Sequence, residues 1–326
     1  MSKPVIATII GDPAGIGPEV VVKALATGKP YEISRPVLIG CTEAVEQALE
    51  ITGASFKVNK VTEIDGVGEN PGEIDVYDTG RLDPNAYELG VESAACGKAT
   101  ADWLKEGEEL ALAGKVDAVI MAPINTGSMK MANVLDQIIP PEPGSTYLTL
   151  LNGPLRVVHL TDHMPLKDVS GLITKELVHG AIKLIHDSFT AWGTANPKIG
   201  VSGFNCHAMG EEDATEIVPA VEQAKAEGIN VEGPVAPDTV FRRCVDEQYD
   251  VVLCMYHDQG HIALKTWKFS GNCAMTLGLP YLSLSVAHGT AFDIVGKNIA
   301  DPDMILNSML QAASFSAGTG FIKQAA

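Results

Sequence analysis

Several common functional patterns are missing from this sequence. It contains no GxGxxG turn, no GK[ST] phosphate-binding loop and no CxxC pair. No apolar run approaches the roughly 20 residues that a membrane-spanning helix needs. These absences argue against a P-loop nucleotide site and against a membrane protein. The six cysteines are scattered, which indicates reduced thiols in a cytoplasmic protein; they are Cys41, Cys96, Cys206, Cys244, Cys254 and Cys273.

Positive charge is also scarce. Lys and Arg number 23 against 41 Asp and Glu, and the formal net charge is −18. Nucleic-acid binding requires clustered basic residues, so we expect no nucleic-acid partner. An anionic substrate would need a locally basic pocket in this acidic chain. The first residues, 1–4, lead directly into an apolar segment and are unlike a signal peptide, which also favours a cytoplasmic location.

Short apolar runs alternate with amphipathic stretches along the whole chain. This alternation predicts an α/β fold with mostly parallel sheets and helices on both faces. With 326 residues, two domains are expected, because single cores stop growing near about 250–300 residues. The predicted strands are Val5–Ile10, Val37–Gly40, Val116–Met121, Arg156–Leu160, Lys198–Gly203 and Asp250–Met255. The predicted helices are Glu19–Ala26, Glu43–Glu50, Val91–Ala113, Lys175–Thr190, Asp213–Glu227 and Pro302–Gln324.

A glycine-rich turn, GDPAGIGPE, occupies residues 11–19, between the first predicted strand and the first helix. Its glycines free the backbone, and Pro18 suits the first turn of a helix, whose N-terminus favours an anion. By itself it is a generic strand-to-helix turn. Asp12 makes it acidic rather than phosphate-binding.

Three histidines each follow a predicted strand: His163 in TDHMPL, His207 in GFNCHAM and His257 in YHDQG. Ligands of open α/β sheets bind at the carboxyl ends of strands, where three imidazoles can hold one divalent metal and leave positions open for a substrate. Each histidine alone is more often a hydrogen-bonded structural residue. Asp258 is expected to orient His257 or to bind the metal through water.

His261 lies four residues after His257, the spacing of an HxxxH pair on a helix. Gly260 and the lack of a helical pattern argue against such a pair, and we expect His261 to be a structural or supporting group. The remaining histidines of this region, His159, His179 and His186, are expected to be surface or packing residues.

The run HGTAFDIVG occupies residues 288–296. It resembles the nucleotide-binding loop of the decarboxylating β-hydroxy-acid dehydrogenases, the isocitrate and isopropylmalate type. Its small residues permit close approach to a ligand, which polar side chains then recognise by hydrogen bonds. The alternative is an ordinary loop before a C-terminal helix.

Together these motifs closely resemble those of the 4-hydroxythreonine-4-phosphate dehydrogenase family, from GDPAGIGPE to HGTAFDIVG. In that family the three corresponding histidines hold a divalent metal, so the resemblance implies that His163, His207 and His257 are the ligands. Neutral imidazoles suit zinc better than magnesium, with manganese and cobalt as further candidates.

The resemblance also implies roles for other positions. Lys265 matches a substrate-contacting lysine and, with Asp238, is a candidate for proton transfer; a solvent-exposed lysine with no role is the alternative. NAD or NADP is expected at His288, Gly289, Thr290, Asp293 and Asn298. Substrate contacts are expected at Asp12, Ser145, Thr146, Lys265, Ala274 and Ser283.

Three of these positions depart from the family pattern. Ser145 replaces a histidine, Ala274 an asparagine and Ser283 an arginine, although Thr146 is kept. Asn272 lies two residues from the expected asparagine. An arginine holds a phosphate with a bidentate fork, so its loss favours a substrate that is unphosphorylated or held differently.

The resemblance implies an isocitrate/isopropylmalate dehydrogenase-like fold of two α/β domains. Residues 1–127 and 286–326 are expected to carry the nucleotide loop, and residues 128–285 the metal and substrate site. The implied activity is metal- and NAD(P)-dependent oxidation of a small anionic hydroxy acid, with decarboxylation, by a homodimer whose chains share the active site. The substrate alternatives are four-carbon sugar-acid phosphates and carboxylated cis-dihydrodiols. Alternatives of another class are a phosphate acyltransferase-like enzyme and a non-catalytic, zinc-stabilised binding protein.

Overall fold

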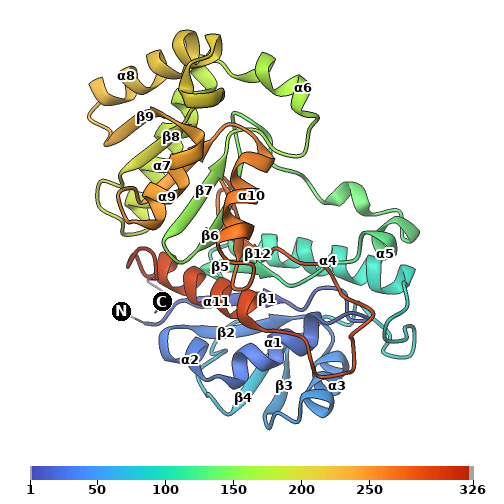
Figure 1. Ribbon diagram of the computed structural model, residues 1–326. Helices are drawn as coiled ribbons and strands as arrows, with labels where there is room; N and C mark the ends of the chain where they lie inside the picture. Colours follow the sequence, from blue (N-terminus) through green and yellow to red (C-terminus); the bar gives the residue numbers. More distant parts are fainter. Residues whose placement is uncertain (1, 323–326) are drawn as a thin grey trace. The chain divides into compact units, whose positions relative to one another are not determined.

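Parallel strands separated by helices make up most of the structure, a computed structural model that describes residues 2–322 (Figure 1). The chain forms two compact units. Among the described residues, the first comprises residues 2–139 and 280–317, and the second comprises residues 140–279 and 318–322. The domain boundaries expected from the sequence lie elsewhere, between residues 127 and 128 and between residues 285 and 286.

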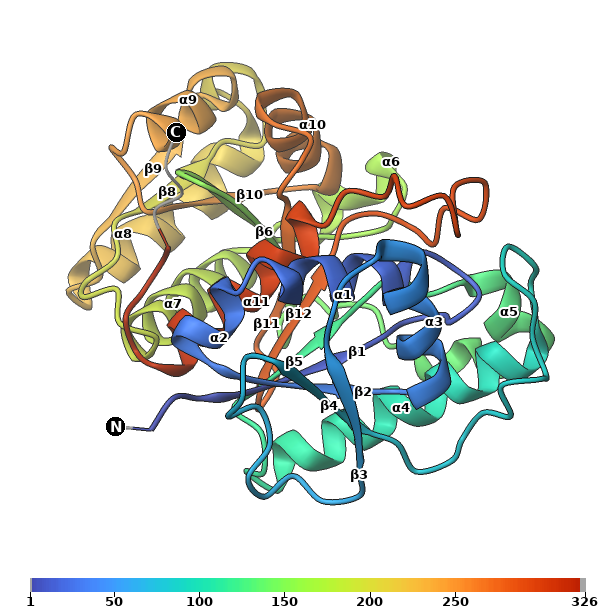
Figure 2. The same ribbon diagram turned by 90° about the horizontal axis from the view of Figure 1, so that it is seen from below.

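The first unit contains a six-stranded parallel arrangement, in the order β3-β4-β2-β1-β5-β12. Its strands are β1 (Val5–Ile9), β2 (Arg35–Ile39), β3 (Lys57–Val61), β4 (Glu73–Tyr77), β5 (Ala118–Met121) and β12 (Leu282–Val286). Its helices are α1 (Gly17–Ala26), α2 (Lys29–Ile33), α3 (Thr42–Thr52), α4 (Ala94–Leu112), α5 (Thr126–Met131) and α11 (Asp303–Ser316). Helices α1, α3 and α11 cover one face of these strands and α4 covers the other (Figure 2).

The central strands of this unit are buried on both faces, as their continuous apolar sequences predict. Helix α4 begins at a Ser93 cap, whose hydroxyl accepts a hydrogen bond from the Cys96 amide, and it buries Trp103 completely. Strand β3 contains only exposed and half-buried residues, as expected of an edge strand.

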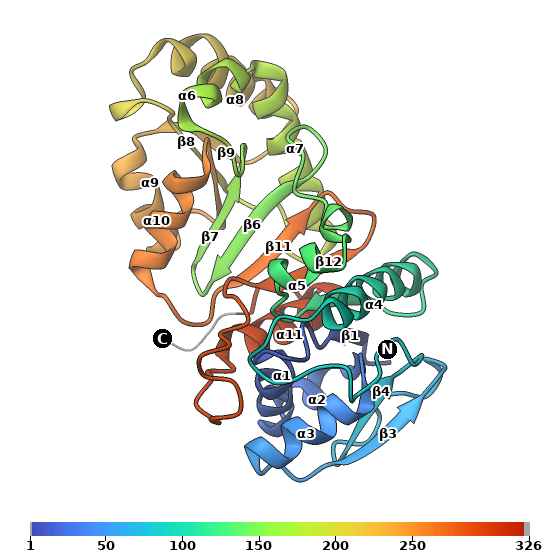
Figure 3. The same cartoon turned by 90° about the vertical axis from the view of Figure 1, so that its right-hand side faces the viewer.

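The second unit has strand order β11-β6-β7-β10-β8-β9. Its strands are β6 (Tyr147–Asn152), β7 (Leu155–His159), β8 (Ile199–Ser202), β9 (Val231–Val235), β10 (Val251–Cys254) and β11 (Cys273–Leu277). The pairs β11/β6 and β6/β7 are antiparallel, whereas β7, β10, β8 and β9 are parallel. Its helices are α6 (Leu166–Val169), α7 (Lys175–Ala191), α8 (Val218–Ala226), α9 (Pro237–Val245) and α10 (His257–Trp267). Helices α9 and α10 lie on one side of the strands and α7 on the other (Figure 3).

The C-terminal helix is present, but its predicted end is wrong. Helix α11 stops at Ser316, and the chain leaves it through Gly318 and Gly320, both with positive φ, instead of continuing to residue 324. Residues 323–324 of that prediction lie outside the described residues. Phe321 packs edge-to-face on Phe189 of α7, which places this end of the chain with the second unit. Among residues 2–322, no helix combines the length and apolar character needed to cross a membrane.

Candidate active site

The ends of β7, β10 and β8 carry the three predicted histidines. Strands β7 and β10 finish side by side, with Cys254 opposite His159. The Thr161 hydroxyl donates to the Met255 carbonyl at 2.8 Å, which joins the two loops that follow these strands. The Gln259 side chain accepts from the Met255 amide at 2.8 Å and donates to the Gly203 carbonyl, at the end of β8, at 2.9 Å. The loops that carry the histidines are therefore tied to one another.

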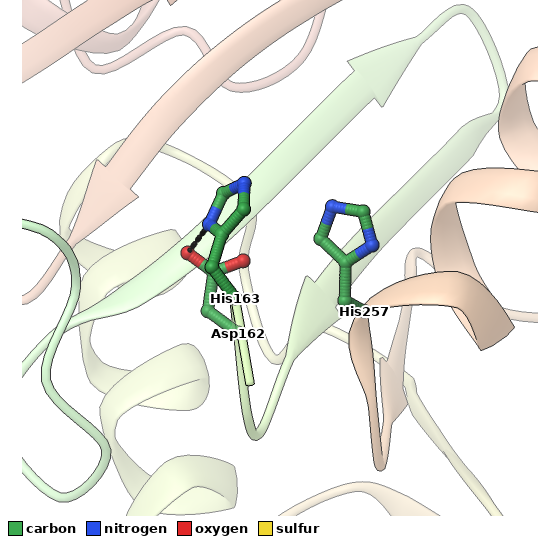
Figure 4. Close-up of side chains that lie close together, drawn as sticks. All are labelled: Asp162, His163 and His257. Carbon is green, nitrogen blue, oxygen red and sulfur yellow. Dashed lines mark ion pairs between the residues drawn. The ribbon is translucent and has the colours of Figure 1, made fainter. Parts of the chain in front are cut away.

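His163 and His257 lie together with a third residue, Asp162, and potential ligand atoms of all three fall within 4.8 Å of one another (Figure 4). The two imidazole centroids are 4.9 Å apart. The Asp162 carboxylate is 6% exposed, and neither oxygen has a hydrogen-bond partner among residues 2–322. Imidazole nitrogens beside a buried carboxylate that accepts no hydrogen bond fit a divalent cation, because a buried negative charge is costly unless it is compensated.

Asp258 orients one of these imidazoles. Nδ1 of His257 lies 2.7 Å from Oδ1 of Asp258, and its N–H donates a hydrogen bond to this carboxylate. Nε2 of His257 then keeps its lone pair, the form in which a histidine binds a metal. Of the two roles expected for Asp258, the structure supports the orienting one.

The structure does not bring His207 into this cluster, although His207 lies on the loop that follows β8. The His207 side chain is exposed, and both His207 and Ala208 have left-handed backbone conformations, at φ 54° and 56°. Such conformations are unfavourable for residues other than glycine. The buried Asp213 carboxylate holds the loop by accepting hydrogen bonds from the amides of Phe204, Asn205 and Gly210. His207 is therefore presented on a loop that is tied down by these hydrogen bonds.

Two further histidines lie beneath the cluster. Helix α10 spans His257–Trp267, so the expected lack of helical context around His261 is wrong. The His261 ring stacks on the His257 ring, with the two centroids 3.7 Å apart. His159, expected at the surface or in packing, is fully buried; its Nε2 lies 3.1 Å from Nδ1 of His261. Burial lowers the pKa of His159 to about 3 and that of His261 to about 4, so this pair is neutral.

A cavity of about 1290 Å³ opens beside the histidine cluster within the second unit. Asp162, His163 and His257 line it together with apolar residues of α9 and α10, including Phe241 and Trp267. Asp238, exposed in the first turn of α9, lines the same cavity, whereas Lys265 lies on an exposed part of α10 and does not.

The predicted substrate residues of the second unit make mainly local contacts. The Ser145 hydroxyl donates to the Glu142 carbonyl at 3.2 Å, and the Thr146 hydroxyl accepts from the Glu142 amide at 2.8 Å. Ala274 is buried in the core of the unit. Asn272 does not replace the family's asparagine, because its amide group is held by Asn152 and by the Phe269 carbonyl.

The predicted nucleotide loop belongs to the first unit and is built against the glycine-rich turn. The Ile16 amide donates to the Thr290 carbonyl at 3.0 Å, and the buried Glu19 carboxylate accepts from the Gly296 amide at 2.6 Å. A Cβ on Gly15 would lie 2.7 Å from Cβ of Thr290, so only glycine permits this approach. The motif at 11–19 thus shapes the loop at 288–296.

The other predicted nucleotide residues lie along this loop. Thr290 is buried, and its hydroxyl accepts a 3.4 Å hydrogen bond from the Asn125 amide group. His288 is half-buried, while Gly289, Asp293 and Asn298 are exposed.

Two predicted substrate residues also belong to the first unit. Asp12 is a buried residue of the glycine-rich turn; burial raises the pKa of its carboxyl group, and Oδ1 accepts from the Ala14 amide. Ser283 lies on β12 beside Val119 of β5.

A second group of possible ligands, Cys41, Glu43 and Asp78, lies in the first unit. The Lys60 ammonium is 3.0 Å from the Asp78 carboxylate and compensates its charge. Burial raises the pKa of Cys41 to about 11, so its thiol is not a ready metal ligand. With its carboxylate already paired and its thiol protonated, this group fits a metal less well than the cluster of Asp162, His163 and His257.

Comparison with known proteins agrees with this arrangement. A β-decarboxylating dehydrogenase from Thermococcus kodakarensis, 16% identical, matches 96% of this chain and 83% of its own with a TM-score of 0.50, which confirms the expected fold class. A 4-hydroxythreonine-4-phosphate dehydrogenase from Burkholderia phymatum matches 97% of this chain and 99% of its own at 33% identity, with a TM-score of 0.84. A terephthalate 1,2-cis-dihydrodiol dehydrogenase from Burkholderia xenovorans LB400 matches 95% and 98% at 29% identity, with a TM-score of 0.68.

Sequence relatives cover nearly the whole chain. A Novosphingobium aromaticivorans protein, named by inference a 4-hydroxythreonine-4-phosphate dehydrogenase, is 52% identical over 98% of this chain and 97% of its own. A Halalkalibacterium halodurans protein, named by inference a D-threonate 4-phosphate dehydrogenase, is 38% identical over 96% and 97%. The family model described as pyridoxal phosphate biosynthetic protein PdxA matches residues 32–312. The chain belongs to this family, the 4-hydroxythreonine-4-phosphate dehydrogenase family of oxidoreductases.

Proposed function

We propose that the protein is a divalent-metal- and NAD(P)-dependent dehydrogenase acting on the secondary hydroxyl of a small anionic hydroxy acid. The observation that carries this proposal is the cluster of His163, His257 and the unpartnered Asp162 at the carboxyl ends of β7 and β10. Membership of a dehydrogenase family supports the reaction class.

The residues of the second unit have distinct roles in this proposal. The residues of this cluster would hold a divalent metal, which would supply Lewis acidity toward the substrate hydroxyl, and NAD(P) would be the hydride acceptor. His257 binds through Nε2 while Asp258 fixes its ring. Asp238 lines the same cavity as the two histidines and is the better placed of the two proton-transfer candidates, since Lys265 does not line that cavity.

The third predicted ligand comes from a second copy of the chain in this proposal. His207 is exposed on a strained loop that hydrogen bonds tie down, and it is not part of the cluster of its own chain. A homodimer in which each His207 completes the partner's site accounts for both facts. A strained conformation that is firmly held is the arrangement expected of a functional residue.

The substrate is a hydroxy acid of the classes named for the relatives. Those names include 4-hydroxythreonine 4-phosphate, D-threonate 4-phosphate and a terephthalate dihydrodiol. Serine at positions 145 and 283 and alanine at 274 remove charged and amide contacts of the family pattern, which favours a substrate without a phosphate, such as the third class, or a phosphate that is held differently. Decarboxylation follows where oxidation creates a ketone β to a carboxylate.

The test is nicotinamide reduction by metal-loaded protein with either NAD or NADP. The panel contains 4-hydroxythreonine 4-phosphate, the 4-phosphates of threonate and erythronate, and a carboxylated cis-dihydrodiol. We expect turnover of one compound and a loss of at least about 100-fold in His257→Ala, because even an outer partner of a metal ligand is worth about 10–100-fold. His179→Ala, a change of the same type on α7, should retain activity.

Other outcomes identify other functions. Turnover of 4-hydroxythreonine 4-phosphate would show that the replacements at 145, 274 and 283 do not prevent that reaction. Acyl transfer to phosphate without NAD or metal would replace the proposal with the acyltransferase. Unfolding on metal removal, without turnover of any compound, would point to a zinc-stabilised binding protein.

A further inference from the structure

We infer that Asp162 is itself a ligand of the metal and supplies the site with an anionic oxygen beside its imidazoles. The inference rests on the metal site of the proposed function and deepens it, because the three histidines expected from the sequence would give a neutral, all-nitrogen site. Oδ2 of Asp162 lies 2.9 Å from Nδ1 of His163 (Figure 4).

Apart from the His163 ring, the part of the chain that the structure describes gives the Asp162 carboxylate no hydrogen-bond donor. It is 6% exposed, and neither oxygen receives a hydrogen bond from any residue between 2 and 322. His163, its neighbour at ion-pair distance, has a side chain that is 71% exposed and offers only a weak, solvent-screened interaction. A buried carboxylate in this situation is destabilising unless a cation occupies the adjacent space.

The two Asp–His pairs of the cluster differ in geometry. Nδ1 of His257 and Oδ1 of Asp258 form an aligned hydrogen bond, and the Asp258 side chain is 72% exposed. The pair of His163 and Asp162 is 2.9 Å apart, against 2.7 Å for the other pair, but is not aligned as a hydrogen bond, so the lone pairs of Asp162 stay free. Asp258 therefore orients a ligand, whereas Asp162 is available as a ligand.

An anionic oxygen changes which metals the site prefers. Imidazoles suit zinc, whereas manganese and magnesium favour carboxylate oxygens. The mixed set of Asp162, His163 and His257 therefore binds manganese more tightly, relative to zinc, than imidazoles alone would. The same carboxylate destabilises the metal-free protein, because its charge is then buried without compensation.

The experiment compares the wild-type full-length chain with Asp162→Asn after removal of metal by a chelator. Zn²⁺ and Mn²⁺ are titrated separately against a chromophoric competitor, and urea unfolding is followed without metal. We expect Asp162→Asn to bind both metals more weakly, with the loss for Mn²⁺ exceeding that for Zn²⁺ by at least about tenfold. We also expect its metal-free form to unfold at a higher urea concentration than the wild type.

Two control variants separate the explanations. Asp168→Asn removes one exposed carboxylate from the same segment and should leave both affinities unchanged if the effect is ligation rather than net charge. His257→Ala should lose metal binding whatever Asp162 does. Equal losses of Zn²⁺ and Mn²⁺ in Asp162→Asn would mean that Asp162 only orients His163, and unchanged affinities would also overturn the inference. Absence of binding by the wild type would overturn the metal site itself.

Discussion

The His159 imidazole is enclosed between a strand and a helix, in a setting that only its neutral form tolerates. Nδ1 donates to the Leu148 carbonyl at 3.0 Å, and Nε2 accepts from His261 at 3.1 Å. Burial, reinforced by the nearby His261, lowers the pKa of His159 to about 3 in the folded protein. In the unfolded chain its pKa is about 6.5.

This difference predicts acid sensitivity. The contribution of His159 to stability is complete above pH ~6.5 and declines by at most about 1.4 kcal/mol per pH unit as the pH falls toward ~3, because only the unfolded chain takes up the proton. In His159→Gln the amide still donates to Leu148 but does not titrate. Between pH ~7.5 and ~5, wild-type metal-free protein should therefore lose roughly 2 kcal/mol more stability than the variant, measured by urea unfolding with chelator present. Parallel pH curves for the two proteins would contradict this assignment.

Helix α10 can approach strands β7 and β10 because residue 260 has no side chain. A Cβ there would lie 2.4 Å from Nε2 of His159, 2.7 Å from Val157 and 2.9 Å from Cys254. Gly260→Ala should therefore destabilise the fold by about 1–3 kcal/mol through overpacking. Gly180→Ala, in helix α7 with nothing within 4 Å, should instead stabilise by about 0.5–1 kcal/mol. Urea midpoints of the two variants test this, and a neutral Gly260→Ala would show that α10 can shift outward at no cost.

The element-level predictions succeeded where one strand or helix carries its own signal. Continuous apolar runs identified β1, β7 and β10, and the parallel arrangement then placed His163 and His257 at one edge of the strands. Helix α10 was missed because Gly260 reduces helix propensity, although close packing requires it. Strand β3 was missed because its edge position leaves a polar sequence.

Tertiary features of the cluster had weaker sequence signals. Asp162 beside a histidine is unremarkable until the fold buries it without a partner. His159 has no local motif, and its pairing with His261 joins residues 102 positions apart. The sequence around Asp213 predicts only the first residue of a helix, yet its carboxylate accepts hydrogen bonds from the loop that carries His207.

At the scale of the whole molecule, the predicted functional residues are divided between the two units. The nucleotide loop and Asp12 belong to the first unit, whereas Asp238 and the three predicted metal ligands belong to the second. The proposed metal ligands are divided again, because His207 stays outside the cluster of His163 and His257. This second division is the feature that a shared dimeric site would explain.

Hybrid dimers test that explanation directly. His207→Ala and His257→Ala proteins, each expected to be inactive alone, are unfolded together in equal amounts and refolded. If each site takes His257 from one chain and His207 from the other, half of the dimers are hybrids, and each hybrid regains one of its two sites. About a quarter of wild-type activity should then return. Each variant refolded alone is the control, and sedimentation confirms that the dimers re-form. No recovery in mixtures that contain re-formed dimers would place both histidines in the site of a single chain, which would require the loop around Asp213 to move His207 toward His163 and His257.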